Sequence, residues 1–134
     1  MIKETLTYTD YSGIKREEDF FFNLTQVEWM RVSAKCGGDI QAFIAKCVRD
    51  NDVSAMLEFI ETLVQTAYGE KSPDGRKFNK GSDILESFIR TEAYNDFVIS
   101  LFTDTNKAAN FFNRLVPKEI VTDANTPSSI SIVR

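Results

Sequence analysis

The sequence has 134 residues, the size of one ordinary domain, and its 43% hydrophobic and 27% charged residues are typical of soluble globular proteins. Its 16 basic and 20 acidic residues give a net charge of −4, which disfavours nucleic acid as the main partner, and no apolar run is long enough to span a bilayer. We therefore expect a cytosolic protein that binds neither nucleic acid nor membrane.

The first 23 residues have the pattern of a β-hairpin. The segment MIKETLTYTDY alternates between apolar and polar residues, as a half-buried strand does. Its apolar face holds Ile2, Leu6 and Tyr8. The segment DYSG predicts a turn in which Asp10 is a cap and Gly13 takes a positive φ, and a second strand follows over residues 14–22.

The second strand ends in three phenylalanines, residues 20–22. Phe20 and Phe22 share one face of the strand, whereas Phe21 points to the other, because successive side chains of a strand alternate. Either a second layer covers Phe21, or its ring is available to a partner.

After the hairpin, the apolar residues recur with the period of helices. The segment TQVE has the form of a capping box, which predicts a first helix from Thr25 to the glycine pair 37–38. A second helix follows Asp39, and a third, the longest, runs from Asp52 to Ala67. The apolar stripes of these helices hold Val27, Met30 and Ala34, then Ile40, Phe43, Ile44, Cys47 and Val48, then Val53, Met56, Leu57, Ile60, Leu63, Val64 and Ala67.

Two or three further helices are expected between residues 82 and 117. Their expected N-caps are Ser82 or Asp83, Thr91, and Thr103 or Asp104. Pro117 ends the last helix, because proline cannot continue a helix. The polar residues 118–134 predict a flexible C-terminal tail, within which the alternating SSISIV can add to an open strand edge.

The expected fold class is therefore α+β, mainly α. An N-terminal β-hairpin over 1–23 precedes a bundle of five or six short helices over 25–117. We expect residues 1–117 to form a single globular domain and 118–134 to form the tail.

Sites for catalysis, metals and cofactors have no support in the sequence. There is no histidine, the commonest general base and metal ligand, and no glycine-rich or P-loop nucleotide motif. The segment DNDVSAMLE, residues 50–58, lacks the central glycine of a calcium loop and is better explained as a helix cap. Cys36 and Cys47 are expected to be free thiols. We expect no catalytic residue, no metal, no cofactor and no enzymatic activity.

The central segment AYGEKSPDGRKF interrupts the helical pattern. Pro73 and Gly75 are typical of a turn, and residues 69–81 carry four basic residues against two acidic ones. The basic residues are Lys71, Arg76, Lys77 and Lys80. One interpretation is a turn that folds back onto the acidic helix starts of residues 82–104. The other makes it a contact for a partner's carboxylates and apolar groups.

Seven residues are candidates for binding a partner: Phe21, Trp29, Tyr68, Lys71, Arg76, Lys77 and Phe78. The aromatic rings offer apolar contact area, and the basic side chains offer charge. For each aromatic residue, burial in the core is the favoured alternative.

Three phrases of the sequence resemble tail assembly chaperones of long-tailed bacteriophages, especially those that infect Gram-positive hosts. They are TYTDYSGIKREEDFFFNLT near the start, AYGEKSPDGRKFNK at the centre, and FIRTEAYNDFVISLFTDTNKAANFFNRLVPKE after it. The resemblance is an ordered set of phrases up to about Glu119 and contains no catalytic signature.

The resemblance implies a non-catalytic protein that binds the aggregation-prone tape measure protein, keeps it soluble and promotes assembly of the tail tube around it. Further implied partners are the tail tube protein and a frameshifted, longer form of the same chain, and the hairpin edge suggests self-association. The resemblance also implies action in the cytoplasm of the infected or lysogenic host and absence from the mature virion. Two alternatives remain: a structural tail or head-completion component, or a small acidic phage protein that binds a host regulator.

Overall fold

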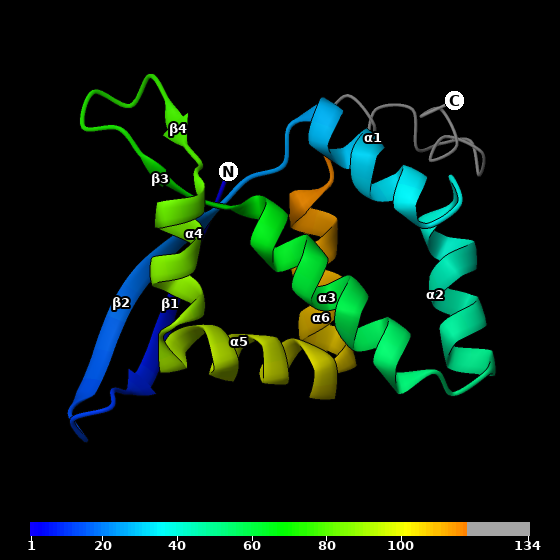
Figure 1. The fold of residues 1–134 in the computed structure, drawn as a ribbon, viewed down its shortest axis with the longest axis horizontal. Helices are drawn as coiled ribbons and strands as arrows, with labels where there is room; N and C mark the ends of the chain where they lie inside the picture. The colour runs from blue at the N-terminus through cyan, green and yellow to red at the C-terminus, as the bar shows by residue number, and fades with distance from the viewer. Residues whose placement is uncertain (118–134) are drawn as a thin grey trace. The chain divides into compact units, whose positions relative to one another are not determined.

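The computed structural model describes residues 1–117, which form four strands and six helices (Figure 1). The strands are β1 (Ile2–Thr9), β2 (Lys15–Phe22), β3 (Tyr68–Lys71) and β4 (Phe78–Asn79). The helices are α1 (Gln26–Lys35), α2 (Ile40–Arg49), α3 (Val53–Ala67), α4 (Ser82–Ile89), α5 (Glu92–Thr103) and α6 (Thr105–Leu115). The mainly helical α+β class and its N-terminal hairpin are thereby confirmed.

The chain is arranged in two compact units. One combines Met1–Asn23 with Ala67–Leu115 and so contains the strands and helices α4, α5 and α6; the other includes Leu24–Thr66 with helices α1 and α2 and most of α3. That residues 1–117 form a single domain stays a prediction. The expected tail, 118–134, lies outside the described residues.

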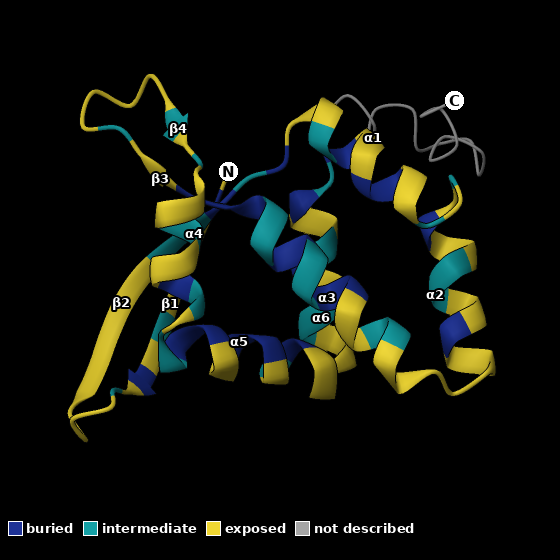
Figure 2. Cartoon of the chain, in the orientation of Figure 1, coloured by how far each residue is buried: buried dark blue, intermediate teal, exposed yellow. Residues whose placement is uncertain are grey.

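Strands β1 and β2 form the predicted hairpin, in antiparallel register from Ile2↔Phe22 to Thr9↔Lys15. The expected alternation along β1 is confirmed. Ile2 and Tyr8 are buried and Glu4 and Leu6 are half-buried, whereas the residues that separate these four are exposed. Figure 2 shows that most of β2 is exposed, and only its phenylalanine end runs into the interior.

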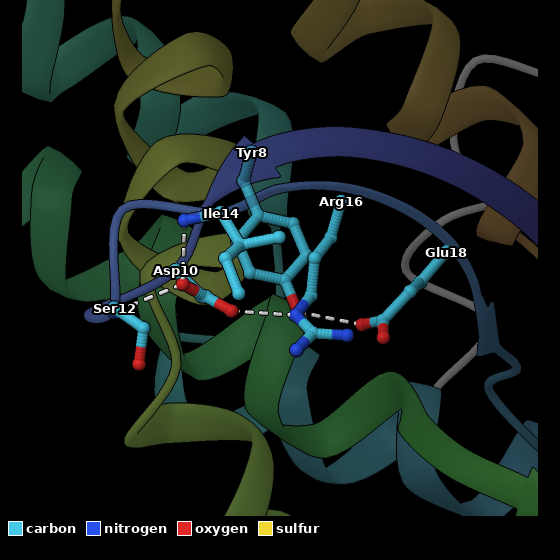
Figure 3. A network of polar contacts seen from close by, with 6 residues as sticks. All are labelled: Tyr8, Asp10, Ser12, Ile14, Arg16 and Glu18. Carbon is cyan, nitrogen blue, oxygen red and sulfur yellow. Dashed lines mark hydrogen bonds and ion pairs between the residues drawn. The ribbon is translucent and has the colours of Figure 1, made fainter.

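Asp10 organises the turn of this hairpin (Figure 3). Its Oδ1 accepts hydrogen bonds from the backbone N–H groups of Ser12 and Ile14, each at 2.9 Å, and its Oδ2 accepts one from Arg16 Nε at 2.6 Å. The Arg16 guanidinium, and after it the backbone N–H groups, hold the pKa of the Asp10 carboxyl below its usual value. Gly13 has a φ of 81°, so both features predicted for this turn are confirmed.

A second polar contact, between Tyr8 and Glu18, joins the two strands beside the turn (Figure 3). The Tyr8 hydroxyl donates to Glu18 Oε1 at 2.6 Å. This hydrogen bond, together with burial, raises the pKa of Tyr8 to about 12, because both favour the neutral phenol. The Asp10–Arg16 and Tyr8–Glu18 contacts both join the two sides of the hairpin next to its turn, and both favour the observed register.

Phe22 is the centre of the aromatic core of this unit. It is 0% exposed, and its ring centroid lies 5.3 Å from those of Phe97 in α5 and Phe111 in α6. Phe20 lies beside it on the same face, 5.2 Å from Phe88 of α4. Helices α4, α5 and α6 thus cover the face of the sheet that carries Phe20 and Phe22. Edge-to-face and stacked ring pairs of this kind stabilise a core beyond their buried area.

The sheet has two strands that the sequence did not reveal. Strand β3 pairs with β2 through Phe21↔Gly69 and Phe22↔Tyr68, and β4 pairs with β3, so the strand order is β1-β2-β3-β4. The prediction of a loop throughout 69–81 was wrong at both of its ends. These strands are four and two residues long, too short for an alternating pattern to show.

The residues on either side of the segment Leu24–Thr66, Asn23 and Ala67, are hydrogen-bonded to each other at the edge of the β2–β3 pairing. The Asn23 N–H donates to the Ala67 carbonyl at 2.8 Å, one position beyond the pair Phe22↔Tyr68. The chain therefore leaves the sheet after β2 and returns to it beside the same strand.

The first three helices begin and end much as predicted. Thr25 and Glu28 form the capping box, with hydrogen bonds of 3.1 and 3.0 Å, and Gly37 follows the end of α1 with a φ of 80°. Asp39 caps α2 through the Ala42 N–H at 3.0 Å. Helix α3 spans Val53–Ala67, after the cap formed by Asp52 and the Ala55 N–H.

The apolar stripe predicted for α1 was wrong. Val27, Met30 and Ala34 are exposed, whereas Trp29 and Val32 are buried. Helix α1 has apolar residues on two faces, and the large indole of Trp29 removes more apolar area from water than the aliphatic face does.

The caps of the last three helices agree with the sequence at two of three positions. Thr91 caps α5 through the Tyr94 N–H at 3.3 Å, and Asp104 precedes α6 and accepts from the Lys107 N–H at 3.1 Å. The N-cap of α4 is Gly81, with no side-chain hydrogen bond, instead of Ser82 or Asp83. Glycine is an acceptable N-cap because it leaves the first N–H groups open to water.

Candidate partner-binding surface

Strands β2, β3 and β4 bring two phenylalanines together on the face of the sheet opposite the aromatic core. Phe21 lies directly across from Gly69, and Phe78 directly across from Lys71. A Cβ at position 69 would lie 2.6 Å from Cε2 of Phe78, so the Phe78 ring covers this glycine. The backbone of Gly69 therefore separates the two rings, each of which is half-buried.

Lysine side chains surround these rings. Lys71 Nζ lies 5.9 Å from the centroid of Phe21, and Lys80 Nζ lies 5.7 Å from that of Phe78. Lys80 Nζ also donates to the Asn23 carbonyl at 2.6 Å, which holds its stem against the sheet. On the other side, Lys3 is the cross-strand neighbour of Phe21 and shares its face. We call Phe21, Phe78, Lys3, Lys71 and Lys80 the aromatic–lysine surface.

This surface has the chemistry of a recognition site. An ammonium within about 6 Å of a ring contributes about 0.5–1 kcal/mol at an exposed position, so the lysines are favoured where they lie. Lys3 and Lys71 can also donate to a carboxylate, because an ammonium carries three N–H donors. The surface thus combines apolar contact area with positive charge.

The turn between β3 and β4 is closely hydrogen-bonded. The Ser72 N–H donates to the Lys77 carbonyl at 2.8 Å, and Asp74 Oδ1 accepts from Ser72 Oγ at 2.7 Å and from the Arg76 N–H at 3.0 Å. Gly75 has a φ of 75°, as a turn interpretation of SPDG predicts. The hydrogen bond from Ser72 Oγ, and then that from the Arg76 N–H, lower the pKa of Asp74.

The side chains of Arg76 and Lys77 are exposed at this turn. Within residues 1–117, neither forms an ion pair with an acidic side chain. For these two side chains, the interpretation in which the turn folds back onto acidic helix starts has no ion pair to support it in the described part of the chain.

Comparison with known protein families decides the class of protein. The sequence model of the phage tail assembly chaperone family matches residues 1–131. The chain belongs to this family. No curated protein and no solved structure matches it. Membership implies interaction with tail proteins and suggests a non-enzymatic role.

Three of the seven residues predicted from the sequence of this chaperone lie together in the aromatic–lysine surface, two (Arg76 and Lys77) lie at the exposed turn, and two are buried. Phe21, Lys71 and Phe78 are the three. Tyr68 is on the opposite face of the sheet, buried at 9% exposure, where its ring stacks on Phe88 at 4.1 Å between centroids. Burial raises the pKa of Tyr68. Trp29 is 0% exposed, so for both residues the alternative of burial in the core holds.

Sequence reasoning about the chaperone missed Lys3, Gly69 and Lys80 as parts of the surface. The alternation of β1 was sufficient to place Lys3 on the outer face of the hairpin. The pairing of β2 with β3 was needed for the other two, and no local pattern indicates it.

The described part of the chaperone contains neither a cluster of metal-ligating side chains nor a helix able to span a membrane. In residues 1–117, no group of three or more histidine, cysteine, aspartate or glutamate side chains is arranged to hold a metal ion. None of the helices in that range is long and apolar enough to cross a bilayer.

Proposed function

We propose that this chaperone binds the tape measure protein through the aromatic–lysine surface, keeps it soluble and promotes assembly of the tail tube around it, without catalysis. The observation that carries the proposal is the juxtaposition of two half-buried phenylalanine rings and three lysines on one face of the sheet. Family membership supports a partner among the tail proteins.

The surface suits a client segment with an apolar stripe bordered by carboxylates. Phe21 and Phe78 supply apolar area, whose burial contributes about 25 cal/mol for each Å² removed from water. Lys3 and Lys71 lie on either side of Phe21 and are both exposed. An amphipathic helix places apolar residues on one face with charged residues at its borders, which matches this arrangement.

Arg76 and Lys77 extend the positive charge beyond the rings. Both lie at the turn between β3 and β4, which projects at the upper left in Figure 1. Reversal of both charges is expected to weaken client binding, and the loss should shrink as salt is added, because salt screens exposed charges. The fold should be unaffected, since the turn is held by backbone groups together with Ser72 and Asp74.

Co-expression with the tape measure protein of the same phage tests the proposal. The chaperone should keep that client soluble and co-purify with it, and Lys71→Glu should reduce the recovered complex. Lys15→Glu is the matched control: it makes the same charge change on the same sheet face, about 20 Å along β2 from Phe21 at 3.3 Å per residue. An insoluble client with no complex, or equal losses in both variants, would refute the proposal.

The same proposal places the chaperone in the cytoplasm of the host during assembly and outside the finished particle. Mass spectrometry of purified virions should find little or none of this chain. Its recovery there in a fixed ratio to tail proteins would instead identify a structural component.

A further inference from the structure

The free edge of β1 is the longest unpaired strand edge in the described residues. Strand β1 is the first in the order β1-β2-β3-β4, and within residues 1–117 no strand pairs with its other side. It is eight residues long, with neither proline nor glycine, whereas β4 at the opposite edge has two residues. Proteins usually shorten or block such edges, because their N–H and C=O groups attract another strand.

The register of the hairpin shows which backbone groups face this edge. The Asp10 N–H donates to the Ile14 carbonyl, so this pair is hydrogen-bonded across the hairpin. Hydrogen-bonded and non-hydrogen-bonded pairs alternate in an antiparallel ladder. The residues whose N–H and C=O groups point to the free edge are therefore Lys3, Thr5, Thr7 and Thr9. All four are exposed.

We propose that β1 of a second copy of this chain pairs with this edge, antiparallel and with Thr5 at the two-fold axis. The two hairpins then form one continuous sheet. Such a contact is closed, because each copy offers the same strand, and two-fold dimers are the commonest closed assemblies.

Charge distinguishes this register from its two neighbours. A register centred on Glu4 places two carboxylates directly opposite each other, which is unfavourable. A register centred on Leu6 places Lys3 of one copy opposite Thr9 of the other. The neighbour of Thr9 on β2 is Lys15, so two positive charges come close together, which is also unfavourable.

The register centred on Thr5 instead places Lys3 of one copy opposite Thr7 of the other, and the neighbour of that Thr7 on β2 is Glu17. The long Lys3 side chain then extends toward an acidic residue of the other copy, and the contact is repeated by symmetry. On the inner face this register sets Glu4 opposite Leu6, and Glu4 keeps its own partner, Arg114, at 3.5 Å.

Thr5→Pro tests the edge, with Thr5→Val as the matched control. Both variants lose the hydrogen bond from Thr5 Oγ1 to Asp19 Oδ1, but only proline removes the N–H that points to the edge. Light scattering after size exclusion should give twice the chain mass for the wild-type protein and for Thr5→Val, and the single-chain mass for Thr5→Pro. A wild-type monomer at all concentrations, or a dimer in all three proteins, would overturn the proposal.

Cysteine trapping provides a second test that needs no proline. Opposite residues of a hydrogen-bonded pair have Cα atoms about 5.5 Å apart, within the range of a disulfide. With oxidised glutathione as the oxidant, which is reduced to two thiols as the disulfide forms, Thr5→Cys should form a covalent dimer. Thr7→Cys should not, because it lies opposite Lys3. Equal cross-linking of both, or of neither, contradicts the register. If Thr5→Pro lowers capture of the tape measure protein while the wild-type chain is monomeric, the edge belongs to the client and the proposal fails.

Discussion

Gly69 lies beneath the ring of Phe78, so closely that no larger residue fits without displacement. A Cβ at position 69 would be 2.6 Å from Phe78 Cε2 and 2.8 Å from the Asn79 carbonyl oxygen. The ring can turn aside, but the backbone oxygen cannot do so without breaking the β3–β4 pairing. The absence of a side chain at this position therefore maintains the aromatic–lysine surface.

Gly69→Ala should lower the free energy of unfolding by about 1–3 kcal/mol, as overpacking does. Denaturant titration measures the loss. Gly81→Ser is the control, because a Cβ there meets no heavy atom within 4 Å, the residue has an extended φ of −170°, and serine is a favoured residue at this N-cap of α4. Equal stability of the two variants would show that the sheet adjusts to the added methyl group.

Phe21 and Phe22 are neighbours in sequence with opposite expected roles. Phe22→Ala should destabilise the protein by about 3–5 kcal/mol, because it empties a fully buried ring site. Phe21→Ala removes a half-buried ring from the other face and should cost much less stability while weakening client binding. Thermal unfolding and co-purification of the client measure the two effects. The prediction fails if both variants lose stability to the same extent.

Tyr8 should make the protein sensitive to alkaline pH. Its pKa is about 12 in the folded protein and 10.0 ordinarily. The stability that its neutral hydroxyl contributes is therefore fully present below about pH 10 and is lost as the pH rises through about 12. Tyr8→Phe should remove this part of the loss, so that its free energy of unfolding falls less steeply over that interval. Parallel curves for the two proteins would contradict the assigned hydrogen bond to Glu18.

Asp10 should act at the acidic end of the pH range. Its folded-state pKa is lowered, chiefly by Arg16, so its stabilising effect is present above the unfolded-state pKa and is lost as the pH falls through the folded-state value. Asp10→Asn should therefore be less stable than the wild type at neutral pH and approach it in acid. Urea titrations at a series of pH values measure the difference in the free energy of unfolding between the two proteins. A difference that stays constant with pH would show that the carboxyl is unpaired in solution and would contradict the prediction.

Local patterns predicted much of the fold. The alternation of β1 and the position of Phe22 followed from the period of a strand, and the caps Thr25, Asp39 and Asp104 followed from side chains that satisfy free N–H groups. The choice between the two apolar faces of α1 did not follow, because Trp29 is buried by tertiary packing that a helical period does not contain.

The candidate site was predictable only in part. Phe21, Lys71 and Phe78 were identified by chemistry, but their proximity rests on two short ladders between segments that are distant in sequence. Tyr68 is one residue from Gly69 and faces the opposite side, so a shift of one position in the pairing would exchange their roles. Propensity does not resolve a register of this kind.

The position of Leu24–Thr66 in the chain, between the hairpin and the helices that cover it, has a consequence for synthesis on the ribosome. Phe20 and Phe22 emerge early, but the rings that cover them, those of Phe88, Phe97 and Phe111, are translated only after the whole of Leu24–Thr66. At bacterial elongation rates the nascent hairpin carries bare aromatic side chains for several seconds. Until those later residues are made, the hairpin exposes on its inner face the same kind of apolar surface that the finished core encloses.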